Sequence, residues 1–167
     1  MATALFYASS TGNSEEIADK IASELGGIET FDLSSTSIDK MNEYEKVILG
    51  GSTWGDGELN DDWDEAWDSF AALNLTDKTI ALFGLGDQDG YPDEFCSALG
   101  IIYEQVSTTG AKIVGFTSTD GYDFDDSKAV IDGKFVGLVI DEDNQDDLTD
   151  ERISSWTENI KADILAS

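Results

Sequence analysis

The stretch Ala8-Ser9-Ser10-Thr11-Gly12-Asn13-Ser14 joins an apolar run at residues 4–7 to an amphipathic segment that begins at Ile17. A junction of this kind is typical of a strand, a turn and a helix. Its four hydroxyl side chains, the unpaired N–H groups of a helix start and the positive end of the helix dipole can converge on one anion. No Lys or Arg precedes Lys20, and the Gly-Lys-Ser/Thr of a Walker loop is absent. The motif predicts phosphate binding through neutral donors; taken alone, it also fits an ordinary polar strand-to-helix loop.

Composition limits the possible functions. The chain has 167 residues, of which 40% are hydrophobic, so we expect a single domain over residues 1–167. A formal net charge of −27 excludes nonspecific nucleic-acid binding, which relies on Lys and Arg. The absence of histidine excludes His-dependent triads and most zinc sites. The N-terminal residues lack the basic region of a signal peptide, and no apolar run is long enough for a membrane span. The single cysteine, Cys96, fits a reducing compartment. We therefore expect a cytoplasmic protein, or a stromal one in a plastid.

Short apolar runs alternate with helical patterns along the chain. We expect strands at residues 2–8, 28–33, 47–51, 79–85 and 112–116, with a strand resuming at 135–140 after a polar segment at 117–134. Helical stripes of apolar residues lie between and after them: Ile17, Ile21 and Leu25; Leu59, Trp63, Ala66, Trp67, Phe70 and Leu73; Phe95, Leu99, Ile102 and Val106; Ile153, Trp156, Ile160 and Ile164. Repeated strand–helix units predict an α/β fold with a doubly wound parallel sheet. Ligands in that class bind beyond the carboxyl ends of the strands, where the strand order reverses.

Two loops at that edge each carry one large aromatic residue among glycines and acids. The loop after the third strand contains Trp54, and the loop after the fourth contains Tyr91. An aromatic ring in such a loop exposes apolar area unless a flat ligand or the core covers it. Either residue alone could fold back onto the core, but together with the phosphate turn they favour a planar phosphorylated ligand. The tryptophans on helical stripes, Trp63, Trp67 and Trp156, are expected in the core.

Four motifs carry a resemblance that runs over essentially the whole chain. They are Ser-Ser-Thr-Gly-Asn-Ser at 9–14, Thr-Trp-Gly-Asp-Gly-Glu-Leu at 53–59, Gly-Asp-Gln-Asp-Gly-Tyr at 86–91 and Ser-Thr-Asp-Gly-Tyr-Asp-Phe at 118–124, extended by Asp-Glu-Asp-Asn-Gln at 141–145. With these motifs the chain closely resembles the long-chain flavodoxins, particularly those of cyanobacteria and algae. The resemblance implies one non-covalent FMN and a five-stranded parallel sheet in the order 2-1-3-4-5. It also implies that a long insertion, here residues 117–134, interrupts the last strand.

The resemblance also assigns the FMN-binding positions. The turn from Ser9 to Ser14 would hold the phosphate, Trp54 and Tyr91 would stack on the isoalloxazine, and Thr53 and Asp143 would contact the ribityl chain. The full predicted set is Ser9, Ser10, Thr11, Gly12, Asn13, Ser14, Thr53, Trp54, Gly55, Asp56, Gly57, Gly86, Asp87, Tyr91 and Asp143. No catalytic residue and no metal ligand is predicted. The sequence departs from the family pattern at Ser14, where Thr is commoner, and at Pro92, which directly follows the stacking tyrosine.

The resemblance further implies a low-potential one-electron carrier that works with the semiquinone/hydroquinone couple of FMN. It would replace ferredoxin between photosystem I and a ferredoxin–NADP reductase. The expected partners have basic docking surfaces, which attract a carrier of charge −27. An FMN-dependent NAD(P)H:quinone-type reductase is the main alternative. A receiver domain would need acidic residues directly after the first and third strands, but the sequence has Ser9-Ser10 and Ser52-Thr53 there. A calcium site at residues 141–147 is also disfavoured, because this run lacks the Gly and the terminal Glu of an EF-hand loop.

Gly55 yields a first prediction. Flavin N5 gains a proton in the semiquinone, so a backbone carbonyl at Gly55 beside N5 would favour that state. The required peptide flip uses backbone angles that glycine reaches at low cost, although Gly55 could equally serve only to permit a tight turn. We predict that Gly55→Val lowers the yield of semiquinone in an anaerobic reductive titration followed by visible absorption. An unchanged yield would contradict the flip.

Overall fold

The computed structural model describes residues 3–8, 13–33, 35–54, 58–59, 61–87, 90, 95–142 and 144–164; for residues 13–14, 52–54, 58–59 and 61–62 it describes the backbone alone. Its strands are β1 (Thr3–Ala8), β2 (Glu29–Asp32), β3 (Lys46–Trp54), β4 (Glu58–Leu59), β5 (Thr79–Leu85), β6 (Lys112–Val114), β7 (Thr117–Ser118), β8 (Val130–Ile131), β9 (Lys134–Phe135) and β10 (Leu138–Ile140). Its α-helices are α1 (Asn13–Glu24), α2 (Asp61–Ala71), α3 (Ser97–Ser107) and α4 (Thr149–Ile164). Two 3-10 turns, η1 (Ile38–Glu43) and η2 (Asp146–Leu148), precede β3 and α4.

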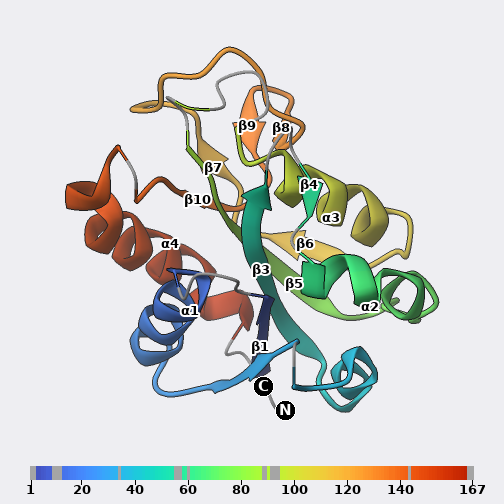
Figure 1. The fold of residues 1–167 in the computed structure, drawn as a ribbon. Helices are drawn as coiled ribbons and strands as arrows, with labels where there is room; N and C mark the ends of the chain where they lie inside the picture. Colours follow the sequence, from blue (N-terminus) through green and yellow to red (C-terminus); the bar gives the residue numbers. More distant parts are fainter. Residues whose placement is uncertain are drawn as a thin grey trace.

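The main sheet is parallel and follows the order β2-β1-β3-β5-β10 (Figure 1). This confirms the predicted order 2-1-3-4-5, with β5 as the fourth strand position and β10 in the fifth. Adjacent strands are paired over most of their length, from Thr3↔Lys46 to Ala8↔Gly51 between β1 and β3. The chain reverses its direction of travel across the sheet after β2, so β1 and β3 flank the topological switch point.

The fifth strand position is shared by two short strands. β6 pairs with the first half of β5, through Thr79↔Lys112 to Ala81↔Val114, and β10 pairs with its second half, through Phe83↔Leu138 to Leu85↔Ile140. Residues 115–137 leave the sheet between them, which confirms the predicted interruption and extends it slightly beyond 117–134. A Cβ at Gly137 would overlap the carbonyl of Leu82, so the returning chain passes directly over the middle of β5.

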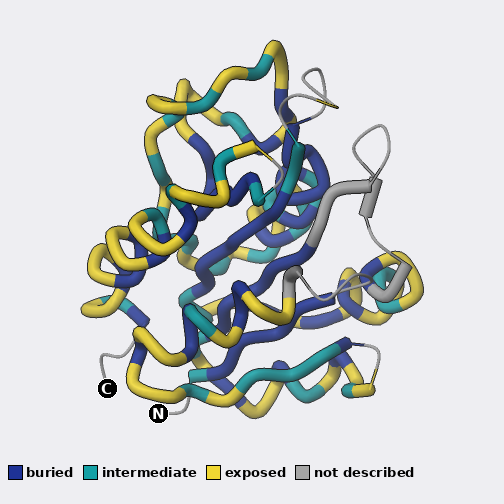
Figure 2. The backbone as a smooth tube through the Cα atoms, turned by 60° about the vertical axis from the view of Figure 1, so that its left-hand side comes forward, coloured by how far each residue is buried: buried dark blue, intermediate teal, exposed yellow. Residues whose placement is uncertain are grey.

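The helices cover both faces of the sheet. Alternate residues of β1 point to opposite faces, so that Phe6 packs with Trp63 of α2 and Leu99 of α3, whereas Leu5 packs in the cluster that contains α1 and α4. Because both faces are covered, the strands are almost continuously apolar and buried, as Figure 2 shows for the central tubes. Within the described part of the chain, every helix falls short of the length and apolarity that a bilayer span requires.

Indole N–H groups anchor two of the helices. Trp63 of α2 donates to the carbonyl of Gly50 at 2.9 Å, and Trp156 of α4 donates to the carbonyl of Gly115 at 2.8 Å. Both indoles are almost completely buried, which confirms their expected place in the core. Trp67 is only half-buried and packs against the edge of the same cluster as Trp63.

Helical spacing overestimated the length of two helices. Leu59 lies in β4, which pairs antiparallel with the end of β3, and Leu73 follows the last residue of α2. Phe95 precedes α3, although it is fully buried against that helix's side of the sheet. Periodicity could not separate these cases, because a buried residue just outside a helix continues the apolar stripe in sequence. The stripe of α4, in contrast, is buried as expected at Ile153, Trp156, Ile160 and Ile164.

The insertion folds around a small antiparallel sheet, β7-β9-β8, and a cluster of aromatic rings (Figure 1). The Phe135 ring contacts Phe95, Tyr122 and Phe124, with ring centroids 6.0, 4.9 and 5.4 Å away. The Tyr122 hydroxyl donates to the carbonyl of Val139, and the Thr117 hydroxyl donates to the carbonyl of Gly137, both at 2.6 Å. The insertion is therefore fixed to β10 by side chains as well as by the chain itself.

Gly100 yields a prediction on stability. It lies within α3, and a Cβ at this position would overlap the carbonyl of Lys128 in the returning arm of the insertion. Alanine normally stabilises a helix relative to glycine by about 1 kcal/mol, but overpacking of a tight contact costs about 1–3 kcal/mol. We predict that Gly100→Ala lowers the free energy of unfolding in urea, whereas Ser154→Ala on the exposed side of α4 changes it little. A gain in stability for Gly100→Ala would contradict the close contact.

Candidate functional site

The strand register brings four loops to one edge of the sheet. Ala8 pairs with Gly51 and Ser52 pairs with Leu85, which also pairs with Ile140. The chain therefore leaves β1, β5 and β10 at nearly the same level, while β3 continues two residues beyond Ser52 to Trp54. The motifs at 9–14, 53–59 and 86–91, and the run at 141–145 that extends the resemblance, start from this edge, whereas the motif at 118–124 lies in the insertion.

The described residues cover part of the predicted site. Asn13 and Ser14 are the first residues of α1, and Thr53 and Trp54 are the last of β3, where they pair with Leu59 and Glu58. Gly86 and Asp87 follow β5. The remaining predicted positions lie outside the described residues: Ser9, Ser10, Thr11, Gly12, Gly55, Asp56, Gly57, Tyr91 and Asp143. The helix start at Asn13 agrees with a turn that opens a helix.

Gly86 holds the end of β5 close to the start of α3. Its N–H donates to the carbonyl of Ile140 at 3.1 Å, which extends the pairing of β5 with β10 by one residue. A Cβ on Gly86 would lie 2.8 Å from Sγ of Cys96 and 2.9 Å from its backbone N, so no larger residue fits without movement. Cys96 itself has a left-handed backbone with φ of 54° and is fully buried. Cys96 is the residue directly before α3, not part of the helix, and its side chain packs in the core.

A polar cluster that sequence reasoning missed links the loops after β5 and β10. The Asn144 side-chain NH₂ donates to Asp87 Oδ1 at 2.8 Å and to Asp141 Oδ2 at 2.9 Å. Asp141 is fully buried, and its Oδ1 also accepts the backbone N–H of Asn144 at 3.0 Å. The sequence signal was the run Asp-Glu-Asp-Asn-Gln at 141–145, which the resemblance included without giving Asn144 or Asp141 a role.

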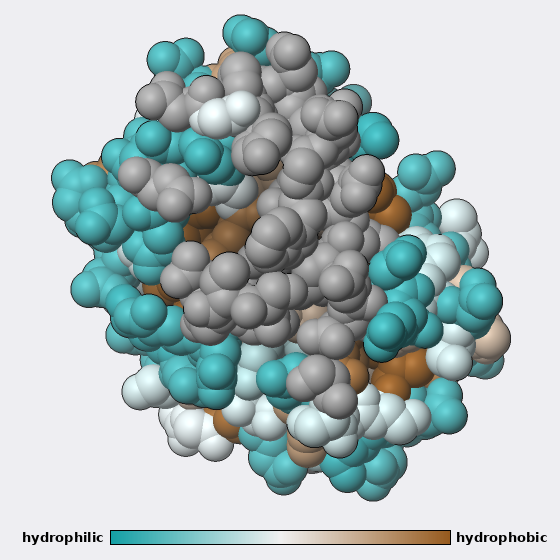
Figure 3. All heavy atoms as spheres, viewed as in Figure 1, coloured by the Kyte–Doolittle hydropathy of each residue, from teal (hydrophilic) through white to brown (hydrophobic). Residues whose placement is uncertain are grey.

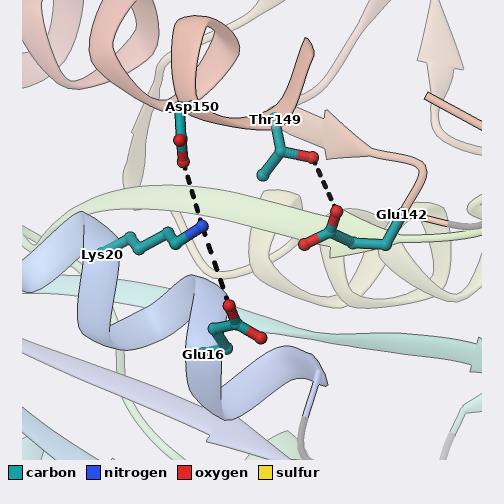
Figure 4. A network of polar contacts seen from close by, with 5 residues as sticks. All are labelled: Glu16, Lys20, Glu142, Thr149 and Asp150. Carbon is teal, nitrogen blue, oxygen red and sulfur yellow. Dashed lines mark hydrogen bonds and ion pairs between the residues drawn. The ribbon is translucent and has the colours of Figure 1, made fainter. Parts of the chain in front are cut away.

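Lys20, the first cation after the phosphate turn, is engaged by helix carboxylates (Figure 4). Its ammonium lies 3.0 Å from Asp150 and 3.8 Å from Glu16, so it joins α1 to α4, and the hydrogen bond to Asp150 raises the pKa of Lys20. Beside it, the Thr149 hydroxyl donates to Glu142 at 2.9 Å, which ties the start of α4 to the loop after β10. Lys20 is thus engaged between α1 and α4; the prediction of phosphate binding through neutral donors concerns residues 9–14, of which 9–12 lie outside the described residues.

The electrostatic environment at the end of β1 is negative. Burial, and secondarily the carboxylates of Glu15 and Asp32, raise the pKa of the Tyr7 hydroxyl to about 12. An anion that binds next to Ala8 must therefore be held by directed N–H and O–H donors strong enough to offset this field. A helix start that follows a hydroxyl-rich turn supplies donors of that kind.

A hollow of about 420 Å³ lies between the insertion and α4, beside the break in the fifth strand. Phe116, Leu138 and Trp156 form its apolar wall, while Arg152 stacks on the Tyr122 ring with its Cζ 3.9 Å from the centroid. The rim carries carboxylates as well, and Figure 3 shows hydrophilic side chains over most of the outer parts of this face, with only small apolar patches. Of the residues that line the hollow, Leu138 belongs to β10, where it pairs with Phe83 of β5.

The residues present fit a phosphorylated planar cofactor at the four-loop edge. The helix start at Asn13 directs N–H donors to the turn, and the close contact at Gly86 leaves only backbone facing Cys96. Asn144 links the loops after β5 and β10 by donating to Asp87 and Asp141. Cysteine and carboxylate side chains of the described residues form no cluster of three that could hold a metal ion.

Comparison with known proteins gives a consistent result. A family profile described as flavodoxin matches residues 5–156. The flavodoxin of a Nostoc species is 46% identical over 161 residues, which covers 95% of each chain, and that of Helicobacter pylori is 49% identical over 157 residues, which covers 94% of each. A crystal structure of Fusobacterium nucleatum flavodoxin bound to flavin mononucleotide superposes with a TM-score of 0.93 at 33% identity and covers 98% of each chain.

The buried thiol beside this edge yields a prediction. Burial raises the pKa of Cys96 well above its ordinary value, and the Asp141 charge adds to the shift. The reactive thiolate is thus disfavoured in the folded protein. We predict that a thiol reagent at about pH 8 labels Cys96 very slowly in the native protein and rapidly in urea. Complete labelling of the native protein at the rate of the unfolded chain would contradict the burial.

Proposed function

Because this chain belongs to the flavodoxin family, we propose that it is a low-potential carrier of single electrons that uses one non-covalently bound FMN in a single domain over residues 1–167. FMN is its cofactor, and the chain is an electron-transfer protein, not an enzyme. The observation that carries the proposal is the in-register pairing that brings the four motif-bearing loops to one edge of the sheet.

The residues proposed to hold FMN come from all four loops. Ser9, Ser10, Thr11, Gly12, Asn13 and Ser14 would bind the phosphate; Thr53, Trp54, Gly55, Asp56, Gly57, Gly86, Asp87, Tyr91 and Asp143 would contact the ribityl chain and the ring system. Bound FMN supplies reversible one-electron redox chemistry. The chain's own contribution is to hold the phosphate with neutral donors and to cover the ring with aromatic side chains. Trp54, at the end of β3, is one of these covering residues.

The negative charge of the chain determines whether the redox potential of bound FMN would be raised or lowered. With a net charge of −27, the protein disfavours the addition of negative charge to a group bound at its surface. Each tenfold preference for one redox state over another shifts a one-electron potential by about 59 mV. The acids that flank the site would therefore lower the potential, and salt would weaken the contribution of the exposed ones, since the Debye length is about 8 Å at physiological ionic strength.

The same charge supports a proposal about partners. A surface this acidic attracts proteins with basic docking surfaces and speeds their association at low salt. We propose a monomeric cytoplasmic carrier that replaces ferredoxin between photosystem I and a ferredoxin–NADP reductase. This choice of partners rests on the resemblance in the sequence motifs and on the charge; cyanobacterial flavodoxins are 43–47% identical to the chain, and that of Helicobacter pylori is 49% identical.

Stepwise anaerobic reduction of the purified, FMN-loaded protein tests the proposal. We expect two separate one-electron steps in the visible spectrum, the second at a strongly reducing potential, and no sustained oxidation of NADPH when a quinone is the only acceptor. Reduction in a single two-electron step, or steady turnover with NADPH, would favour a reductase instead. A protein that gains no flavin absorption when mixed with FMN would refute the binding site itself.

A further inference from the structure

Asn144 lies between two carboxylates that come from different loops. Its NH₂ group is 2.8 Å from Asp87 Oδ1, and 3.2 and 2.9 Å from Oδ1 and Oδ2 of Asp141. Asp87 directly follows Gly86 at the end of β5, and Asp141 directly follows β10. One side-chain amide thus connects the two loops at the edge where the proposed FMN site lies.

The orientation of the Asn144 amide follows from its surroundings. All three neighbouring atoms are carboxylate oxygens, which accept hydrogen bonds, so the nitrogen has to face them and the amide oxygen has to point away. Asp141 is fully buried, and a buried carboxylate is costly unless donors surround it. Asn144 offers it both a backbone and a side-chain donor, which ties Asn144 back to Asp141.

Asp87 orders the other loop in the same way. The oxygen that accepts from Asn144 also accepts the backbone N–H of Gly90 at 2.8 Å, so Asp87 is tied to Gly90 as well as to Asn144. In the sequence, Gly90 directly precedes Tyr91 and Asn144 directly follows Asp143. The Asn144 amide therefore links chain positions that lie next to two of the proposed FMN contacts.

We propose that Asn144 is a positioning residue that holds the loop after β5 against the loop after β10 before FMN binds. The inference rests on the proposed function, since it concerns residues assigned to the FMN site. Without the bridge, binding itself would have to order the two loops, and that ordering would reduce the affinity. Asn144 would then affect FMN binding through Asp87 and Asp141, without any contact of its own with the cofactor.

The test compares FMN dissociation constants of apoprotein variants, measured by fluorescence quenching in the presence of a chelator. We expect Asn144→Ala to raise the dissociation constant about tenfold, as loss of a hydrogen bond to a charged group would. Asn159→Ala is the matched control, because Asn159 is an exposed asparagine on α4 and should leave the constant unchanged. Asn144→Asp keeps the size of the side chain but replaces the donor by a third carboxylate, so its loss of affinity should be at least as large and should shrink as salt is added.

A double-mutant cycle with Asp87→Ala separates positioning from a general structural effect. If Asn144 acts through Asp87, then adding Asn144→Ala to Asp87→Ala raises the dissociation constant by less than about twofold, because the bridge is already lost. Effects that simply multiply, or an Asn144→Ala constant equal to that of the control, overturn the inference while the wild-type protein still binds FMN. Failure of the wild-type protein to bind FMN overturns the proposed function and this inference with it.

Discussion

Parallel hydrogen bonding in register is the constraint on which the rest of the molecule depends. It fixes where β1, β3, β5 and β10 end relative to one another, and it does so with backbone groups that every residue supplies. The strands can lie between two layers of helices only where side chains leave room. Near their carboxyl ends β3 and β5 carry Gly51 and Gly84, where a Cβ would come within 2.9 Å of Trp63 and 3.1 Å of Leu99. The small residues let α2 and α3 approach the sheet near the edge from which the motif-bearing loops leave.

Much of this architecture could be predicted from sequence because it repeats. The run at 79–85 is apolar throughout and bounded by polar residues, and it forms β5 with the expected ends. The stripe of α4 has the helical period and is buried at each expected position. Where prediction failed, the apolar residue belonged to another element: Leu59 belongs to β4, and Phe95 is buried before α3 begins. An apolar residue indicates a buried position, but periodicity alone does not show whether that residue belongs to the helix or to a neighbouring element.

Some features of the candidate site could likewise be predicted from the sequence, and others could not. The sequence predicted which loops would gather at one edge, because that follows from strand order and from motifs that lie beside each strand end. It did not predict the bridge from Asp87 to Asp141 through Asn144, since those residues are more than fifty positions apart and contact depends on the register of β10 with β5. The left-handed backbone of Cys96 was equally hidden, because it follows from the close approach of Gly86 and not from a local turn signal.

The side-chain hydrogen bonds of the insertion also bear on how the protein avoids self-association. β10 lies at the open margin of the sheet, and the carbonyls of residues 137 and 139 face the same way, as alternate carbonyls of an extended chain do. They accept from Thr117 and Tyr122, while the carbonyl of Ile140 accepts from the opposite side, at Gly86. The outward acceptors of the edge strand are thus already satisfied within the chain. A second polypeptide that approached β10 would find these acceptors already occupied, which disfavours strand addition at this part of the margin.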